Sequence, residues 1–411
     1  MQSVDLPASG RTGPDAGEVP FRFNELFFSR TDLRGKIQAG NSVFQRVSQY
    51  SWAEMLNKPH NIVRDPEMPR GLFYYLWDKL RRSEPMGGYV KNRAKDGRYY
   101  WVFAIVTPIA DGYMSVRLKP SSPLLDLVKQ EYARAYREER TSGISPAESG
   151  ALLMKRVEEL GFRNYETFMA MALGQEMSAR ASALGLPPDP VVSAFLSLVT
   201  SSQSLLDAAT TIFEGYNSHR FVPLNLQVQA GRLGEVGAAI GMISTNYSIL
   251  SDEIRNGMGT FIGAAHDAAT TIAEGAFLLG TAMIQQEIID IFRKEDQTDT
   301  QVDHTREMRI LQEQRDTYHH KAVSNLQAIQ RDIERFHTET QQMKRLASGL
   351  AAIRLMGKVE SGRLSVGVLN DLIADLQVFQ AVILKGLTDI VAVNHALKQN
   401  ASNLLAAYMA A

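Results

Sequence analysis

In the first part of the chain, short apolar runs of the β type alternate with polar turn residues, whereas the second half repeats apolar positions with a helical period. Turn residues such as Asp32-Leu33-Arg34-Gly35 and Asp96-Gly97 separate short runs rich in aromatic and β-branched residues, a pattern typical of strands joined by hairpins. Two helical stretches interrupt it, Asn41 to Gln49 and Pro69 to Arg81. The pattern predicts strands over residues 25–30, 36–40, 87–94, 98–109 and 113–119.

The middle of the chain, residues 121–190, reads as a helical connector. Ser145-Pro146-Ala147-Glu148 combines a capping box with proline at the first helical position, which predicts a helix start. A further helix is expected from about Asn164 to Leu184, after Gly161. The glycine- and proline-rich segment 185–190 then marks a boundary.

From Val191 onward the apolar period is helical, with the three- and four-residue spacing of a coiled-coil seam. One such seam contains Leu369, Leu372, Leu376, Phe379 and Ile383, and an earlier one contains Leu326, Ile329, Ile333 and Phe336. The polar segment Lys294 to Asp299 separates the two halves. The pattern therefore predicts long helices that reverse direction.

Two glycine-containing segments interrupt these helices. The segment Leu224 to Gly237 is partly repeated by Gly357 to Gly367, and nearly equal lengths of chain separate each one from the polar segment. We expect turns near Gly234 and near Gly362–Ser365. Two hairpins with both turns at one end would bury the apolar seams as a four-helix bundle. The sequence leaves open whether one chain or two chains supply the bundle.

Composition narrows the function classes. The net charge is −1 with mixed signs, so no nucleic-acid footprint is indicated. Cysteine is absent, which excludes disulfides and thiol chemistry and suits a reducing cytoplasm. Residues 1–20 lack the features of a signal peptide, and the apolar window Gly263 to Ile284 contains His266, Asp267 and Glu274, which favours a bundle helix over a membrane span. Because no metal cluster, phosphate-binding loop or nucleophile constellation is visible, we expect no enzyme.

The N-terminal part resembles a known sensor family. The order of two strands, several small helices and a three-strand meander is that of a PAS domain. The blocks KPHNIVRDPEMP and VKNRAKDGRYYWV are similar to the PAS domain of bacterial aerotaxis receptors, over about residues 25–118. The resemblance implies a non-covalently bound FAD that reports redox state. It also implies that the pocket or cofactor residues are Asn41, His60, Arg64, Trp77 and Asn92.

The sequence departs from that family at two positions. Asp65 replaces a histidine of the motif, and Met86 replaces an aromatic residue. A lost aromatic removes a stacking surface, and an added carboxylate disfavours a nearby diphosphate. The alternative is a PAS domain that binds no cofactor and serves as a dimerisation or docking module.

The first glycine-rich segment carries a second resemblance. PLNLQVQAGRLGEVG is similar to the hairpin tip of methyl-accepting chemotaxis receptors, which contacts the coupling protein and the chemotaxis histidine kinase. The resemblance implies partner-binding roles for Leu224, Asn225, Val228, Gln229, Arg232 and Glu235. Gln229 stands where the family has glutamate, and Asn217 stands where an aromatic supports receptor trimers.

Together these features predict an α+β PAS domain followed by an all-α, long antiparallel four-helix coiled-coil bundle. The expected segments are a flexible tail (1–20), the sensor (21–120), the connector (121–190) and the bundle (191–411). The predicted function is a cytoplasmic, chemoreceptor-like transducer that senses redox state, oxygen or a small ligand, with a homodimer or larger array as its assembly. The alternative is a non-chemotactic scaffold or adaptor without cofactor.

Overall fold

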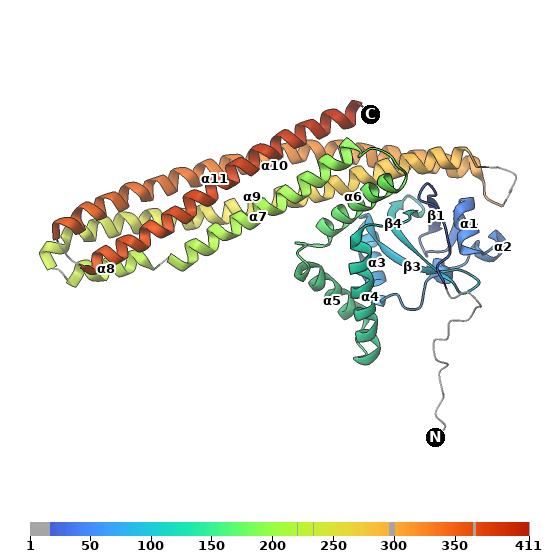
Figure 1. Cartoon of the computed structure of the whole chain (residues 1–411), viewed down its shortest axis with the longest axis horizontal. Helices are drawn as coiled ribbons and strands as arrows, with labels where there is room; N and C mark the ends of the chain where they lie inside the picture. The colour runs from blue at the N-terminus through green and yellow to red at the C-terminus, as the bar shows by residue number, and fades with distance from the viewer. Residues whose placement is uncertain (1–16, 220, 233, 296–300, 365–366, 411) are drawn as a thin grey trace, which may run out of the picture. The chain divides into compact units, whose positions relative to one another are not determined.

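The computed structural model describes residues 17–219, 221–232, 234–295, 301–364 and 367–410. The chain forms two compact units (Figure 1). The first takes Met1–Leu196 and Ala276–Val323, and the second takes Ser197–Gly275 and Ser324–Ala411. The helices α9 (Ala238–Arg293) and α10 (His304–Leu364) contribute to both units. The predicted boundaries near residues 20, 120 and 190 concern successive segments of the chain and stay a prediction.

The first unit contains a five-stranded antiparallel sheet with the order β2-β1-β5-β4-β3. Its strands are β1 (Phe27–Asp32), β2 (Ile37–Gly40), β3 (Met86–Arg93), β4 (Tyr99–Ile109) and β5 (Gly112–Leu118). Between β2 and β3 lie α1 (Ser42–Ser48), α2 (Trp52–Met55), the 3-10 helix η1 (His60–Val63) and α3 (Arg70–Arg81). The predicted strands and helices of this region are confirmed, with small shifts at their ends.

Local sequence explains the tight connections of the sheet. The Asp32 carboxylate accepts hydrogen bonds from the backbone N–H groups of Arg34 and Lys36, both at 2.9 Å. Gly35 between them has φ +72°, a conformation that glycine adopts without a steric cost. At Gly112 a Cβ atom would lie 1.8 Å from the carbonyl oxygen of Thr31, so only glycine allows β5 to pair with β1 there.

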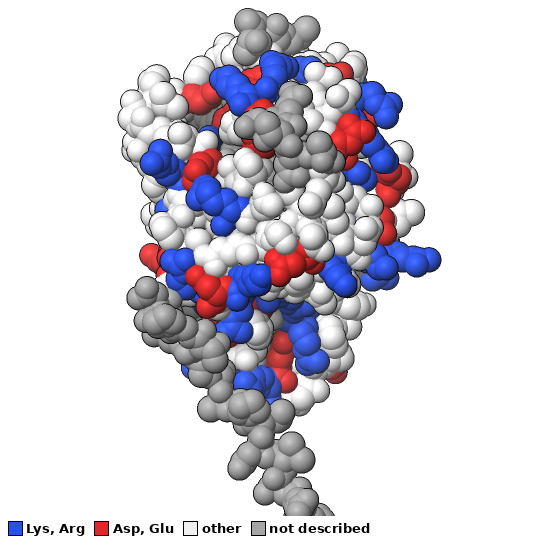
Figure 2. Space-filling model, turned by 90° about the vertical axis from the view of Figure 1, so that its right-hand side faces the viewer, with Lys and Arg blue, Asp and Glu red and all other residues white. Residues whose placement is uncertain are grey.

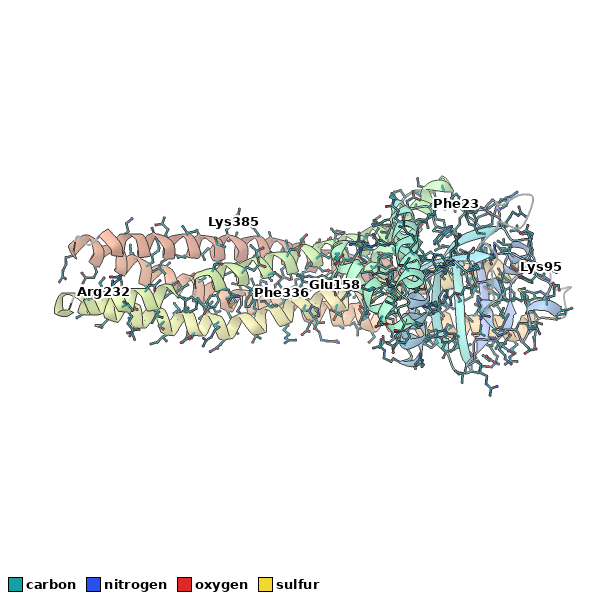
Figure 3. The ribbon with its side chains drawn as sticks, turned by 90° about the horizontal axis from the view of Figure 1, so that it is seen from below. Phe23, Lys95, Glu158, Arg232, Phe336 and Lys385 are labelled. Atoms are coloured by element: carbon teal, nitrogen blue, oxygen red, sulfur yellow. The ribbon has the colours of Figure 1, made fainter. Side chains whose placement is uncertain are left out.

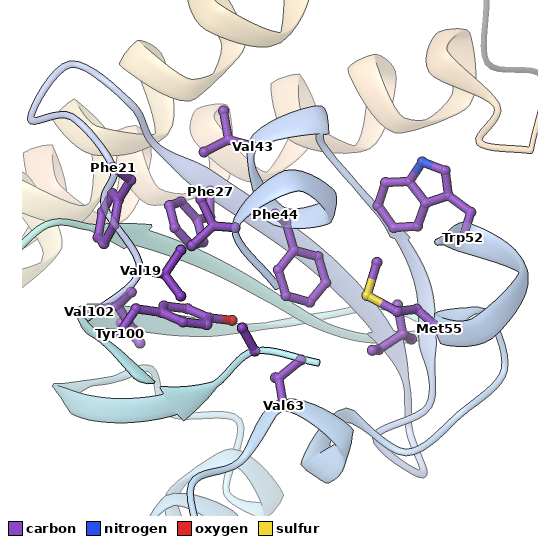
Figure 4. Packing of buried hydrophobic residues seen from close by; sticks show 14 residues of the cluster. Val19, Phe21, Phe27, Val43, Phe44, Trp52, Met55, Val63, Tyr100 and Val102 are labelled. Carbon is purple, nitrogen blue, oxygen red and sulfur yellow. The ribbon is translucent and has the colours of Figure 1, made fainter. Parts of the chain in front are cut away.

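A hydrophobic cluster fills the space between the sheet and helices α1 and α2 (Figure 4). Phe27 from β1 packs edge-on against Phe21, with ring centroids 5.0 Å apart, and lies 6.0 Å from Tyr100 of β4. Phe44 of α1 and Trp52 of α2 cover the other end of the cluster. Such aromatic pairs add about 0.5–1.5 kcal/mol each beyond their buried area.

The connector forms three helices, α4 (Pro123–Thr141), α5 (Pro146–Glu159) and α6 (Tyr165–Ala183). The predicted capping box is present at the start of α5, where Ser145 and Glu148 bond each other's backbone. The buried Glu176 of α6 accepts hydrogen bonds from the Tyr89 hydroxyl (2.7 Å) and from the backbone and side chain of Ser122 (3.0 and 2.6 Å). This carboxylate fixes α6 to β3 and to the start of α4.

The first unit also includes the end of α9 and the start of α10, which pack on the sheet. Phe28 of β1 lies edge-on to Phe292 of α9, with ring centroids 4.8 Å apart. Arg30 of β1 forms a bidentate ion pair with Glu307 of α10 at 2.8 and 2.7 Å, and both side chains are buried. On the face shown in Figure 2, basic and acidic side chains are interspersed, as the net charge of −1 suggests.

The second unit consists of antiparallel helices. It contains parts of α7 (Pro190–His219), α9 and α10, together with α8 (Val222–Arg232), the 3-10 helix η2 (Gly234–Gly237) and α11 (Gly367–Ala410). Helix α7 contacts α9 through Tyr216 and Ser251, and α9 contacts α10 through Phe261 and Phe336. Helix α10 contacts α11 through Glu334 and Lys398, and α11 contacts α7 through Gly386 and Ile212. Each helix therefore packs on two neighbours, and the predicted antiparallel four-helix arrangement is confirmed. Figure 3 shows Arg232, Phe336 and Lys385 within it.

The two predicted turns fall where the long helices reverse. Gly234 has φ +61° between α8 and α9, and α10 ends at Leu364, just before α11. Helix α8 contacts α11, so the two turns lie at the same end of this unit (Figure 1). Leu233 and Ser365 lie outside the described residues, as do the side chains of Glu235 and Leu364.

Two helices are apolar enough to cross a membrane, judged by length and composition alone. They are Pro190–Ser218 and Leu376–Tyr408, not the window 263–284 that the sequence singled out. The bundle core offers another explanation for their composition, because Ile212, Leu387 and Leu397 are fully buried against neighbouring helices.

Candidate ligand-binding site

A cavity of about 300 Å³ lies between the sheet and the segment formed by η1 and α3. This volume is at the lower end of the range for ligand pockets. Its lining comes from β1 (Ser29, Thr31), η1 (His60, Asn61), α3 (Phe73, Leu76, Trp77, Leu80), β3 (Val90, Asn92), β4 (Ala104, Val106) and β5 (Tyr113, Ser115, Arg117), with Arg34, Gly35, Pro59 and Arg64 from loops.

The structure brings four of the five predicted pocket residues to this cavity: His60, Arg64, Trp77 and Asn92. Arg64 and Asn92 also pair through their backbones in an isolated antiparallel bridge. Their roles toward a cofactor stay a prediction, but the prediction that they share one pocket agrees with the geometry.

Asn41 lies outside the lining. Its Nδ2 donates to the Leu26 carbonyl oxygen (2.9 Å), and its Oδ1 accepts from the backbone N–H groups of Phe28 (3.1 Å) and Phe44 (3.3 Å). The amide thus caps α1 and holds it against β1, which uses its hydrogen-bonding groups within the chain. Asn41 contributes to the site by positioning β1.

A buried polar cluster occupies one wall of the cavity. Arg117 Nη2 donates to Ser29 Oγ (2.9 Å) and to His60 Nε2 (2.8 Å). Burial, together with the neighbouring Arg117 cation, lowers the pKa of His60 to about 3, so the imidazole is neutral. Because a guanidinium only donates, Nε2 is the acceptor and the ring proton resides on Nδ1.

Arg117 is a buried cation with a free donor. Its side chain is 4 % exposed, and burial lowers its pKa to about 10. Within the described part of the chain, neither its Nη1 nor the Ser115 Oγ has a hydrogen-bond partner, and no carboxylate forms an ion pair with this guanidinium. Unpaired buried groups of this kind are costly. Both atoms belong to residues that line the cavity, so a ligand can supply the missing acceptors.

Another part of the cavity wall is aromatic and amide-bearing, with residues from α3 and from the sheet. The Trp77 ring lies edge-on to Tyr113 at 5.4 Å, and the Arg64 guanidinium stacks 3.7 Å from the centroid of Phe73. Asn92 is 4 % exposed, and its amide makes no hydrogen bond to the described residues. An amide can both donate and accept, so this wall suits a planar ring with a polar edge.

The sequence missed Ser115 and Arg117. The alternation of β5 gives the signal that could have found them, because Tyr113, Ser115 and Arg117 share one face of the strand. An arginine on the pocket-facing side of an apolar strand is unusual, since arginine is rarely buried without a partner.

The two departures from the aerotaxis-receptor pattern lie outside the lining. Asp65 is buried, accepts from the backbone N–H of Glu67 (2.9 Å) and lies 3.8 Å from the Lys91 ammonium. Met86 is buried at the start of β3. Neither residue therefore changes the walls of the cavity directly.

The predicted partner-binding residues belong mostly to α8. Leu224 and Val228 are 57 % and 48 % exposed, which is high for apolar side chains, and they lie one turn apart. Asn225 and Arg232 are also exposed, and Gln229 is half-buried. The side chain of Glu235 lies outside the described residues. Partner binding by this set stays a prediction.

The hydrogen-bonding groups of the cavity match those of a flavin. A planar isoalloxazine ring presents carbonyl oxygens and ring nitrogens along one edge, which match the free donors of Arg117 and Ser115 and the amide of Asn92. Trp77 and Tyr113 supply aromatic surface for its apolar part. The residues present fit this class of ligand.

Comparison with known proteins supports the assignment of a PAS domain. Residues 39–116 match the family model for the PAS fold. The chain is 38% identical to the Aerotaxis receptor of Escherichia coli over 129 residues, covering 30% of this chain and 25% of the receptor. It is 24% identical to a Biofilm dispersion protein of Pseudomonas aeruginosa over 233 residues, covering 54% of this chain and 49% of that protein.

A crystal structure of a PAS domain from Colwellia psychrerythraea aligns at 19% identity, covering 23% of this chain and 85% of that one, with a TM-score of 0.20. The chain spans about a quarter of the aerotaxis receptor and about half of the biofilm dispersion protein. The five-stranded sheet with its ligand-sized cavity and the match over residues 39–116 agree, and the chain therefore contains a PAS domain and is related to these PAS-containing, chemoreceptor-like proteins.

Proposed function

We propose that this protein is a cytoplasmic, non-enzymatic signal transducer whose PAS cavity holds a flavin, FAD, and responds to its redox state. The observation that carries the proposal is the free donor pair of Arg117 Nη1 and Ser115 Oγ beside the Asn92 amide, in a cavity walled by Trp77. When bound, a flavin supplies reversible uptake of electrons and protons. The resemblance to aerotaxis receptors supports FAD in particular.

The chain's own residues would orient the ring and hold its charge. Arg117 presents a fixed positive charge to the polar edge of the ligand, and the neutral His60 holds that guanidinium in place through Nε2. A charge in this position favours a ligand state with more negative charge over one with less. A change of ligand charge therefore changes the electrostatic interaction between the ligand and the Arg117–His60–Ser29 cluster.

The output is proposed to pass through the helical bundle to a chemotaxis histidine kinase and its coupling protein. The exposed apolar side chains of Leu224 and Val228 at the turn and the resemblance of the tip to chemotaxis receptors support this partner class. A homodimer or larger array would present several such tips together.

An absorption spectrum of the purified full chain tests the proposal. We expect the visible bands of oxidised flavin, their bleaching by dithionite, and release of FAD on denaturation. The variant Asn92→Ala should lower the bound fraction, whereas His266→Gln, an exposed bundle residue, should not. A folded, colourless preparation from flavin-replete cells that also takes up no added flavin would contradict the proposal and favour the docking module.

A further inference from the structure

A second cavity in the first unit adjoins the ligand-binding cavity. It is an open groove of about 430 Å³. Its lining consists of Asn61, Arg64, Pro66, Met68 and Arg70 from the η1–α3 segment and Tyr136, Glu139 and Arg140 from α4. Asn61 and Arg64 line both cavities. These two residues therefore stand between the two cavities.

The groove is positively charged. Three of its side chains are arginines, and each keeps donors beyond the contacts it makes in the chain. Arg64 donates to the Met68 carbonyl oxygen (3.3 Å), Arg70 donates to the Ile144 carbonyl oxygen (3.0 Å), and Arg140 donates to the Tyr136 hydroxyl (3.1 Å).

The single carboxylate of the groove, Glu139, is already bonded. It accepts from the Ser149 hydroxyl (2.6 Å), from the backbone N–H of Gly71 (3.1 Å) and from Arg70 Nε (3.4 Å). Burial alone would raise the pKa of Glu139, but these hydrogen bonds lower it overall, so it is ionised at neutral pH. One negative charge against three guanidinium groups leaves an excess of positive charge in the groove.

The sizes of the two cavities bear on the class of ligand. A volume of about 300 Å³ suits a ring system and a short tail, and the basic groove lies on the other side of the shared residues Asn61 and Arg64. Planar guanidinium groups bind phosphate oxygens in a bidentate manner. The partly exposed ring of Tyr136, next to Arg140, offers a surface on which a nucleobase can stack.

We propose that this groove binds the diphosphate and nucleoside end of a dinucleotide cofactor whose ring system occupies the PAS cavity. The proposal rests on the proposed flavin function and deepens it, because it assigns a place to the diphosphate and nucleoside end of the FAD. It also assigns Tyr136 and Arg140 of α4, which lie beyond the PAS fold match at residues 39–116, to cofactor binding. The connector helix would then be in direct contact with the cofactor.

Binding of three probes to the flavin-free full chain tests this inference: FAD, FMN and riboflavin, followed by quenching of flavin fluorescence. We expect FAD to bind about tenfold or more tightly than FMN, as one added charge-assisted contact allows. Arg140→Glu should weaken FAD binding by about tenfold or more and leave the affinity for riboflavin unchanged. Arg137→Glu is the matched control, since Arg137 is exposed on the same helix and does not line the groove.

The outcomes separate this inference from the proposal on which it rests. Equal affinities for FAD and FMN, or equal losses of FAD and riboflavin affinity in Arg140→Glu, would overturn the groove alone. Failure of all three probes to bind the unaltered chain would overturn flavin sensing and the groove with it. Hydrogen exchange gives a second readout, because FAD but not riboflavin should protect the last turns of α4. Identical protection by both probes would also count against the groove.

Discussion

Arg30 and Glu307 form a buried, bidentate ion pair that ties β1 to α10 within the first unit. The preceding residue of the same strand, Ser29, points to the other face of the sheet and accepts a hydrogen bond from Arg117 in the cavity. Successive side chains of a strand point to opposite faces. Through the adjacent residues Ser29 and Arg30, strand β1 therefore contacts the buried polar cluster of the cavity on one face of the sheet and helix α10 on the other.

Replacing Glu307 with alanine should destabilise the first unit strongly. The change leaves the buried Arg30 guanidinium with only the exposed Asp111 carboxylate, 3.9 Å away, and loss of a buried partner typically costs about 3–5 kcal/mol of the free energy of unfolding. Urea denaturation followed by tryptophan fluorescence measures it, since Trp52, Trp77 and Trp101 all lie in this unit. Arg309→Ala is the control, because that arginine of α10 pairs with Glu313 at the surface and such pairs contribute at most about 1 kcal/mol. Similar small losses for both variants would contradict the buried pair.

His60 should make the first unit acid-sensitive. Its folded pKa of about 3 is below the unfolded value of 6.5, so the unfolded chain binds the extra proton between these two pH values. The contribution of His60 to stability is therefore complete above about pH 6.5 and is lost as the pH falls toward 3, by roughly 1 kcal/mol per pH unit.

Denaturation at pH 7 and pH 5 checks this dependence. The variant His60→Gln cannot be protonated and should lose less stability between the two pH values than the unaltered chain. The exposed His266→Gln should behave like the unaltered chain. If His60→Gln lost as much stability between pH 7 and pH 5 as the unaltered chain does, the imidazole would not be buried in its neutral form.

Arg117→Met should separate ligand binding from stability. The substitution removes a buried cation that lacks a carboxylate partner, and Ser29 Oγ can then donate to His60 Nε2, 3.1 Å away. We expect the free energy of unfolding of the ligand-free protein to change by less than about 1 kcal/mol. The rise in melting temperature that added FAD causes should be mostly lost. A large loss of stability without ligand, with the FAD effect retained, would assign Arg117 a structural role instead.

The sheet could be predicted from the sequence because its strands are runs rich in aromatic and β-branched residues, bounded by turn residues such as Gly35 and Gly97. The long helices could be predicted because their apolar seams run over many turns. The packing of α9 and α10 on the sheet could not. The Arg30–Glu307 pair joins residues far apart in sequence, and the charge of either residue alone does not indicate burial.

The candidate site was predictable only in part. His60, Arg64, Trp77 and Asn92 were predicted from the resemblance to the PAS domain of aerotaxis receptors, and the fold brings them to one cavity. The same resemblance included Asn41, whose amide instead caps α1. A family resemblance does not distinguish a residue that contacts a ligand from one that positions the backbone. The alternation of β5 could have placed Arg117 on the pocket side of its strand, but Tyr136 needed the three-dimensional structure, since α4 meets the η1–α3 segment only in the fold.

Charge reversal at the turn tests the output surface. Arg232 is exposed at the end of α8, so Arg232→Glu should leave the helical content unchanged and abolish co-purification with the kinase and coupling protein. Lys385→Glu, on α11 away from the turn (Figure 3), is the control. Retained partner binding in Arg232→Glu would contradict partner binding at this turn and would favour a scaffold that binds its partners elsewhere.

The final prediction concerns the two hairpin turns, whose central residues Leu233 and Ser365 lie outside the described residues. Nitroxide labels at the exposed Arg232 and Arg363 should report a distance on the order of 10 to 25 Å, because packed helix axes lie about 8–10 Å apart. The packing of α7 on α9 and of α10 on α11 closes each hairpin, and the contact between α8 and α11 joins them at the turns. A straight rod, with the second hairpin extending the first, would instead separate the labels by about 80 Å or more. Dilution with unlabelled chain distinguishes the source of the four helices. A short distance that persists on dilution places all four in one chain, whereas a short distance that disappears means that two chains share the bundle.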